Sequence, residues 1–149
     1  TLGHRPPYCS NSDKDCLQSG SEGERVRAAL EGVLYKGQVD LALWAHEHSY
    51  ERLWPVFNYT VTQKNYVDPA APVHIISGAA GCNEGSGLCL NPIKHSGRDW
   101  SAFHTGILHP YSYGHLRAPN ATHLYVDQVN AQTGHIFDAI WIQKRTRFP

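Results

Sequence analysis

Apolar residues recur at helical spacing between Ser21 and Gly37. Within this segment they fall three or four positions apart, as on one face of a helix: Val26, Ala29, Leu30, Val33 and Leu34. Ser21 followed three places on by Glu24 is a capping-box pattern for a helix start. Gly37 is a natural helix stop. The pattern predicts a helix over residues 21–37 whose apolar stripe faces a core.

A short apolar run, residues 38–46 (QVDLALWAH), follows this helix and is typical of a buried strand. Ahead of the helix, Gly3 and His4 stand at a strand end that runs into a proline-stiffened loop. The order strand end, helix, strand indicates a βαβ unit whose first strand is reduced to a stub. Because mature termini rarely fall inside core strands, we expect the chain to be the C-terminal part of a larger protein.

The chain after Pro72 has the pattern of β structure. Residues 73–78 (VHIISG) predict a compact strand. Residues 123–130 alternate cleanly, and residues 134–144 follow after a turn, so the two segments predict a hairpin. The glycine-rich segment 81–92 lacks a following Lys-Ser/Thr, which argues against a phosphate-binding loop. The fold class predicted by these elements is α/β (α+β).

Composition argues against nucleic-acid binding and a membrane span, and it draws attention to the histidines. The chain has 149 residues, 41% hydrophobic content and a formal net charge of zero. It carries no basic stripe that would indicate nucleic acid, and no apolar run approaches the roughly 20 residues needed to cross a bilayer. Histidine stands out, with 10 copies. Imidazoles in such number fit metal binding or mildly acidic working conditions, although scattered structural histidines explain most of them equally well.

Two N-glycosylation acceptors begin at Asn58 and Asn120. The cysteines form two short-range pairs, Cys9 with Cys16 and Cys82 with Cys89, but three disulfide connectivities are open. The six-residue gaps are too wide for a zinc knuckle. Acceptor sites and paired cysteines together favour an oxidising compartment, so we expect a secreted or lysosomal protein.

Three histidines stand at strand ends, namely His4, His46 and His48. In open α/β sheets, sites lie beyond the carboxyl ends of the strands. In extended chain, residues two apart face the same side, so His46 and His48 should enter one pocket with Glu47 turned away. His4 lies one βαβ unit earlier and should join them as a metal ligand. The alternative is a chance His-x-His pair on an exposed loop.

At these residues the chain resembles the purple acid phosphatases of the metallophosphoesterase superfamily, most strongly their animal iron/zinc members. The segments GHRPPYCS and VDLALWAHEHSYERLWP look like that family's last two motifs. The later segments PVHIISGAAGC, WSAF, YSYGHL, NATHLYVDQV and GHIFDAIWI match its C-terminal region in order. The resemblance covers essentially the whole chain.

The resemblance implies a fold and a set of metal ligands. The fold would be the C-terminal half of a four-layer α/β/β/α sandwich, with residues 1–55 closing the metallophosphoesterase domain and residues 71–143 forming the C-terminal region. His4 and His46 would bind a divalent metal, zinc or another, and His48 a ferric iron. Ala45 stands where the family has Gly. The loop positions where some plant relatives carry paired histidines fall near Asp13 and Lys14.

The implied function is hydrolysis of phosphomonoesters by a binuclear iron/zinc acid phosphatase. The remaining ligands would come from a missing N-terminal half of the same protein, so the chain alone should be inactive. The alternative is a non-catalytic secreted glycoprotein that keeps the fold. Neither a nucleic acid nor a membrane partner is implied.

Several other side chains receive supporting roles. Tyr50 should pack behind the histidines, Glu51 and Arg52 should pair, and His74 should be structural. Four further histidines lie near the family's active-site rim and are more often bystanders there: His95, His104, His109 and His115.

Overall fold

The computed structural model describes residues 1–11, 13–17, 19–81, 98–105 and 111–145. Their helices are α1 (Lys14–Leu17) and α2 (Glu22–Lys36). A first sheet, in the order β1-β5-β2-β6, contains β1 (Leu41–Trp44), β5 (Val73–Ser77), β2 (Tyr50–Leu53) and β6 (Ser101–His104). A second sheet contains β7 (Ser112–Asn120), β8 (His123–Asn130) and β9 (Ile136–Gln143), and a small hairpin pairs β3 (Val56–Phe57) with β4 (Thr60–Val61).

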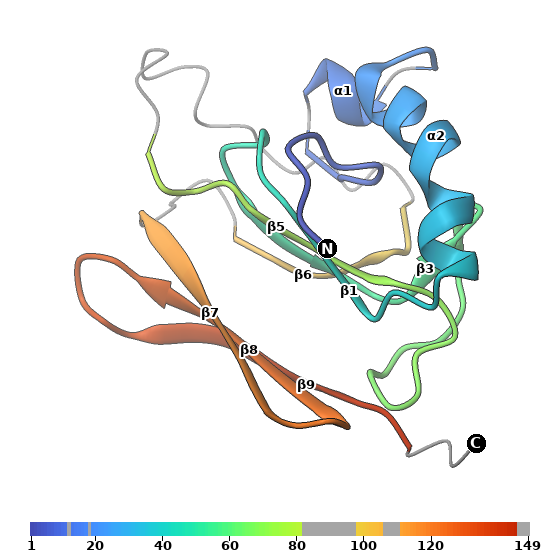
Figure 1. Cartoon of the computed structure of the whole chain (residues 1–149). Helices are drawn as coiled ribbons and strands as arrows, with labels where there is room; N and C mark the ends of the chain where they lie inside the picture. The colour runs from blue at the N-terminus through green and yellow to red at the C-terminus, as the bar shows by residue number, and fades with distance from the viewer. Residues whose placement is uncertain (12, 18, 82–97, 106–110, 146–149) are drawn as a thin grey trace.

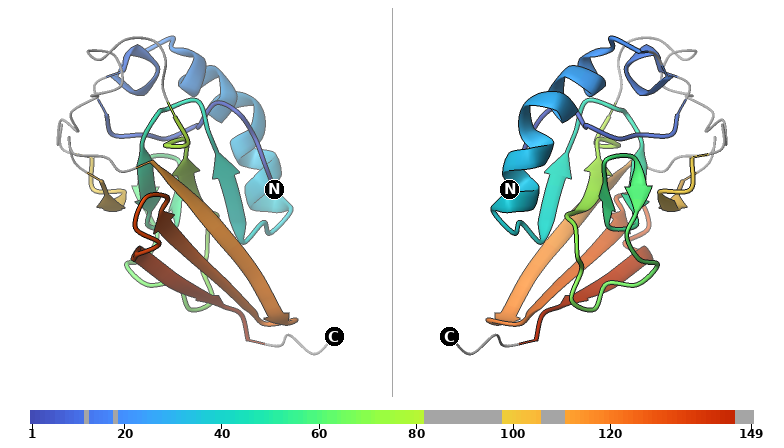
Figure 2. Two further views of the ribbon diagram at one scale, coloured as in Figure 1. Left: turned by 90° about the vertical axis from the view of Figure 1, so that its left-hand side faces the viewer. Right: turned by 90° about the vertical axis from the view of Figure 1, so that its right-hand side faces the viewer.

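These elements form three layers, with α2 on one face of the first sheet and the second sheet on the other (Figures 1 and 2). Between the sheets lies an apolar core that includes Tyr50, Ile75 and Ile142. A second core joins α2 to the first sheet and includes Leu34, Trp44 and Ile76. Mixed parallel and antiparallel sheets with few helices agree with the predicted α+β class. Neither described helix is long and apolar enough to cross a membrane.

The predicted βαβ unit is present at the start of the chain. Leu2 bridges Leu43 in parallel, and the Gly3 amide donates to the Leu43 carbonyl at 2.9 Å. Helix α2 then crosses to β1, which pairs in parallel with β5. Residues 1–4 therefore lie along the free edge of β1 as a short parallel strand. This arrangement brings the chain after Leu2 beside the chain after Trp44.

Helix α2 begins as its cap pattern predicts, but only part of its predicted apolar face is buried. The Ser21 hydroxyl accepts from the Glu24 amide at 3.2 Å. Leu34 is buried and Val26 packs against the same core, as predicted. Leu30 is 41% exposed and Val33 66% exposed, against the prediction. Beside Leu34, Arg27 and Glu31 pair over the loop that follows His4.

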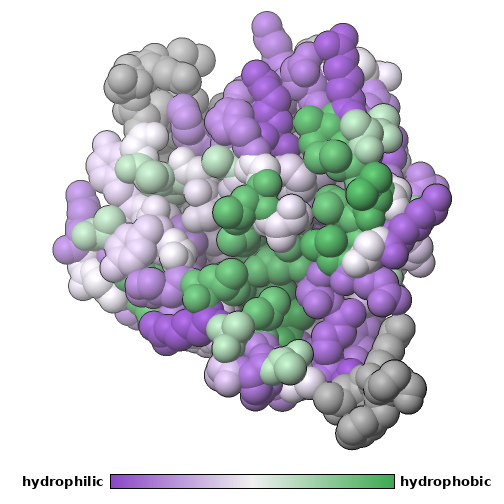
Figure 3. Space-filling view, in the orientation of Figure 1, coloured by the Kyte–Doolittle hydropathy of each residue, from purple (hydrophilic) through white to green (hydrophobic). Residues whose placement is uncertain are grey.

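A second apolar surface lies near the N-terminus. In the space-filling view, green surface gathers across the face that carries the N-terminus (Figure 3). On this face a groove of about 360 Å³ is lined by Leu2, Leu43, Leu116 and Leu124 among others. Leu2 is 80% exposed at the free sheet edge. Such a contiguous apolar surface is typical of an interaction site.

Candidate metal centre

His4 and His46 lie side by side at the carboxyl ends of neighbouring parallel strands. The Ala45 amide donates to the His4 carbonyl at 2.9 Å, which extends the pairing to the last residues of both strands. His46 Nδ1 then lies 3.2 Å from His4 Nε2, with the ring centroids 5.0 Å apart. Two nitrogens bound to one tetrahedral zinc at about 2.05 Å lie roughly 3.3 Å apart. The separation of this donor pair therefore suits a shared divalent metal.

The chain does not stay extended after His46, so the predicted alternation fails. His46 has a positive φ of 61°, and tight turns follow in which Glu47 donates to Ala45 and Ser49 to Glu47, both at 2.7 Å. Glu47 is buried, at 2% exposure, instead of turned away. Gly78 lies against this turn, and a Cβ there would come within 1.9 Å of the Glu47 carbonyl. A left-handed non-glycine residue at such a place is a form of strain that clusters at functional sites.

The turn changes which donor groups come together. Among the described residues, two groups of three or more metal-binding side chains have ligand atoms within 4.8 Å of one another, Asp15–His46–Glu47 and Cys9–Cys16–Glu47. Neither contains His48, which is half-buried. The cysteines of the second group are joined in a disulfide and are not free ligands. Convergence of His48 on the His4–His46 pair stays a prediction.

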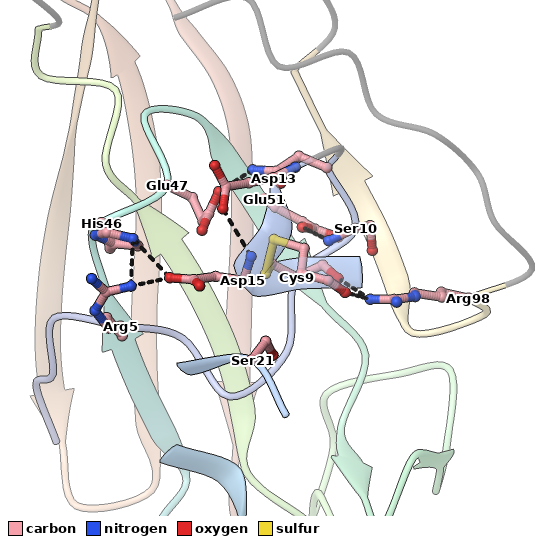
Figure 4. Close-up of a disulfide and its surroundings, with 12 residues drawn as sticks. Arg5, Cys9, Ser10, Asp13, Asp15, Ser21, His46, Glu47, Glu51 and Arg98 are labelled. Atoms are coloured by element: carbon pink, nitrogen blue, oxygen red, sulfur yellow. Dashed lines mark hydrogen bonds and ion pairs between the residues drawn. A yellow bond between two sulfur atoms is a disulfide. The ribbon is translucent and has the colours of Figure 1, made fainter. Parts of the chain in front are cut away.

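A disulfide-closed loop covers the turn. Cys9 and Cys16 are bonded to each other, and the loop between them lies against Glu47 and Glu51 (Figure 4). The Ser10 amide donates to Glu51 at 2.9 Å, and the Asn11 side-chain amide donates to Glu47. The loop therefore bonds one oxygen of each of two carboxylates that the fold buries beside the histidines.

Sequence patterns did not predict that Asp15 would reach the site. Asp15 Oδ2 lies 3.1 Å from His46 Nε2 and is also bonded by Arg5 Nη1. Arg5 Nη1 itself lies 2.9 Å from the same His46 nitrogen (Figure 4). The Cys9–Cys16 spacing is the one signal for this arrangement, because a disulfide between them folds the loop back on itself.

Burial controls the charge of the carboxylates under the loop. It raises the pKa of Glu47 to about 7, while the bond from Asn11 acts in the opposite direction. It also raises the pKa of Glu51, against the bonds that Ser10 donates. Glu47 Oε1 and Glu51 Oε1 are buried without a hydrogen-bond partner among the described residues. The turn is thus held by carboxylates whose charge is costly to bury.

Glu51 and Arg52 do not pair as predicted, because neighbouring residues of a strand face opposite sides. Glu51 points to the disulfide loop. Arg52 points to the second sheet and binds Asp138 through two nitrogens, at 2.7 and 2.9 Å. Tyr50 donates to the same carboxylate at 2.7 Å and packs in the core, as predicted.

The other predicted residues lie away from the histidine pair. His74 is buried in β5 and accepts from Trp44 Nε1 at 2.9 Å, which fits a structural role. His115 pairs with the buried Asp127 at 2.8 Å, and His104 lies on β6. Asn58, in the β3–β4 turn, and Asn120, at the end of β7, are both exposed. Cys82, Cys89, His95 and His109 lie outside the described residues.

Comparison with known proteins assigns the fold and the sequence to one group. Residues 71–139 match the family model "Iron/zinc purple acid phosphatase-like protein C". Acid phosphatase type 7 of Homo sapiens is 45% identical over 155 residues, covering 95% of this chain. The zebrafish (Danio rerio) protein of the same name is 44% identical over 167 residues, covering 100% of this chain. This chain is a relative of the purple acid phosphatases.

The structure agrees with this relationship. A purple acid phosphatase from yellow lupin seeds superposes with a TM-score of 0.76 over 98% of this chain, at 23% identity, which supports the fold. The match covers 25% of the lupin chain. Likewise, the chain spans 33% of the length of the human relative and 35% of the zebrafish one.

Proposed function

We propose that this chain is the C-terminal part of a binuclear metal acid phosphatase that hydrolyses phosphomonoesters. The observation that carries the proposal is the 3.2 Å approach of His4 Nε2 to His46 Nδ1 at the sheet edge where such sites are built. The names of the relatives support the reaction class, since those proteins are called acid phosphatases.

In this proposal the histidines divide between two metals. His4 and His46 bind the divalent ion, zinc or another, and His48 binds ferric iron. Neutral imidazole is a common ligand for both metals. Two metals held close together supply a hydroxide nucleophile and charge neutralisation for phosphoryl transfer. The chain's own residues bind the metals and orient the ligands. The turn after β1 fixes His46, and the disulfide loop holds that turn.

The proposed partner is the preceding part of the same protein, which also supplies the missing ligands. The chain spans only a third of the human relative, and the exposed Leu2 and Leu116 line an apolar groove that the preceding part would cover. In this arrangement residues 1–55 complete a metallophosphoesterase domain and residues 71–143 form the C-terminal region. Anionic ligands from the preceding part would offset the repulsion between the two cations. The chain alone is consequently expected to be inactive.

The proposed location is the secretory pathway, either outside the cell or in the lysosome. The Cys9–Cys16 disulfide and the exposed acceptors Asn58 and Asn120 support an oxidising compartment and glycan attachment. A second candidate function is a non-catalytic secreted glycoprotein. The observation that favours it is the exposure of both acceptor asparagines, which does not depend on a metal site.

A chimera tests the function directly. This chain replaces the matching third of human acid phosphatase type 7, and hydrolysis of an aryl phosphate is measured near pH 5 beside the human protein and the 149-residue chain alone. We expect turnover by the chimera and none by the chain alone. A chimera that folds, takes up both metals and hydrolyses nothing would favour the non-catalytic alternative.

A further inference from the structure

Asp15 is a charged side chain that the proposed ligand set leaves without a role. The two ring nitrogens of His46 meet different neighbours: Nδ1 lies 3.2 Å from His4 Nε2, and Nε2 lies 3.1 Å from Asp15 Oδ2. An imidazole that binds a metal through one nitrogen keeps its proton on the other and donates it, often to a carboxylate. The Nδ1 side of the ring faces His4 and the Nε2 side faces the Asp15 carboxylate, and the Arg5 guanidinium, which can only donate, also lies 2.9 Å from Nε2.

We propose that Asp15 is a positioning residue, which accepts the Nε2–H of His46 and so leaves Nδ1 free for the divalent metal beside His4. This inference rests on the metal site of the proposed function and adds the residue that selects the tautomer of one ligand. Asp15 belongs to the disulfide-closed loop and not to the histidine motifs, so the resemblance to the family assigns it nothing.

The position of Arg5 favours Asp15 as a hydrogen-bond acceptor for His46 over Asp15 as a metal ligand. Asp15, His46 and Glu47 form a group of donors that offers an alternative cation site at Nε2. Arg5 Nη1 lies 2.9 Å from that nitrogen and donates to the same Asp15 oxygen. Because a guanidinium can only donate, a proton on Nε2 leaves Asp15 as the shared acceptor of both groups, whereas a proton on Nδ1 would let Nε2 accept from Arg5 instead. A second cation there would be repelled by the guanidinium. The two nitrogens of an imidazole also point in diverging directions, so Asp15 does not reach a metal on Nδ1.

Hydrogen bonds within the disulfide-closed loop hold Asp15 beside His46. The Asp15 amide donates to Asp13 Oδ1 at 2.9 Å, and the Asp13 amide donates to Asn11 Oδ1 at 2.9 Å. Asn11 in turn donates to the buried Glu47, and Arg98 bonds the carbonyls of Cys9 and Cys16. The loop that carries Asp15 is therefore fixed to the turn that carries His46. The side chain of Asp15 is only 16% exposed, so water competes weakly for its oxygen.

The experiment uses the oxidised 149-residue chain and zinc ions as the probe. Zinc affinity is measured by competition with a chelator for the wild type, Asp15→Ala, Asp15→Asn and His46→Ala. Asp13→Asn is the matched control, because it removes the same charge from the same loop and keeps the acceptor oxygen for the Asp15 amide. In parallel, the imidazole nitrogens of His46 are observed by NMR in the zinc-loaded wild type. This second measurement requires no substitution and is independent of phosphatase activity.

We expect both Asp15 variants to bind zinc roughly 10- to 100-fold more weakly, the usual effect of losing such a carboxylate. Asp13→Asn should stay within about twofold of the wild type, and the NMR spectrum should show a proton on Nε2 and zinc on Nδ1. Wild-type affinity in both Asp15 variants, with zinc lost in His46→Ala, would overturn the role of Asp15 alone. Zinc on Nε2 would overturn it as well. Wild-type affinity in His46→Ala would instead overturn the proposed metal site.

Discussion

At the scale of single residues, His74 shows how the fold controls an ionisable group under the site. Its ring is fully buried in β5, stacks on Trp44 and accepts a hydrogen bond from the Trp44 indole. Burial lowers the pKa of His74 to about 3, so the ring stays neutral at mildly acidic pH. In the unfolded chain the same ring has a pKa of about 6.5. Below that pH the unfolded state gains a proton that the folded state does not.

The contribution of His74 to stability should therefore fall by roughly 2 kcal/mol as the pH drops from 7 to 5, from its two pKa values. Glu47 acts in the opposite direction, because burial raises its pKa to about 7 and the folded state then binds the proton first. His74→Gln keeps a hydrogen-bond acceptor, cannot titrate and leaves Glu47 in place. On going from pH 7 to pH 5, denaturant unfolding should show a stability change that is roughly 2 kcal/mol more favourable in the variant than in the wild type. An equal difference in variant and wild type would exclude His74 as a source of acid sensitivity.

The residues around the metal centre show where prediction from sequence reached its limit. His4 and His46 were predicted to lie together, because the carboxyl ends of parallel strands meet at one edge. Glu47 was placed on the wrong side, because the positive φ of His46 ends the alternation of extended chain. Asp15 was not predicted to reach the site at all. Its contact arises from the path of a closed loop, and residue spacing does not encode that path.

At the scale of elements, a buried ion pair joins the two sheets. Arg52 of β2 binds Asp138 of β9 with both side chains at most 10% exposed, and Tyr66 accepts a further bond from Arg52. Removing one partner of such a pair leaves an uncompensated buried charge. The helix prediction was right in part, since periodicity located α2 and Val26 and Leu34 pack on the core, whereas Leu30 and Val33 are exposed.

Asp138→Ala should destabilise the chain by about 3–5 kcal/mol, because Arg52 then stays buried and charged without an acidic partner. Glu22→Ala is the control, as its pair with Arg25 is exposed on α2 and should change stability by less than about 0.5 kcal/mol. Urea unfolding followed by circular dichroism measures both. If the two variants lose similar stability, Arg52 and Asp138 do not clamp the sheets.

The Cys9–Cys16 bond is a second element-scale constraint. Replacing both cysteines by alanine should cost about 2–3 kcal/mol, the entropy of a loop of this size in the unfolded chain. It should also weaken zinc binding, because Asp15 is no longer held against His46. The wild type under reducing conditions should match the double variant in both measurements. Unchanged zinc affinity after reduction would mean that the loop keeps its shape without the disulfide.

At the scale of the whole molecule, the apolar face is the feature that the fold class did not reveal. The order of the elements and the motifs predicted an α+β fold. Which faces of the chain stay exposed depends on how the two sheets and the helix pack. Whether such a face is covered in the longer protein depends on the part of the relatives that this chain does not span. Val33, which is 66% exposed, reports on whether the exposed face of α2 is covered in the longer protein.

Val33→Glu should leave the isolated chain within about 0.5 kcal/mol of the wild type, because the side chain is solvated there. In the chimera with the human relative it should lower stability by more than 1 kcal/mol, because the charge becomes buried without a partner. Gln132→Glu adds the same charge at the exposed β8–β9 turn and should be neutral in both contexts. Thermal unfolding of the six proteins decides whether the face is covered in the longer protein.

Metal analysis of the chimera tests the central claim most directly, namely that His4 and His46 bind the divalent metal and His48 the iron. Iron and zinc are measured per molecule in the wild-type chimera and in its His46→Ala and His48→Ala variants, with exposed His135→Ala as control. We predict one iron and one zinc in the wild type and the control, loss of zinc with iron retained in His46→Ala, and loss of iron in His48→Ala. Full zinc and iron content in both variants would contradict the assignment.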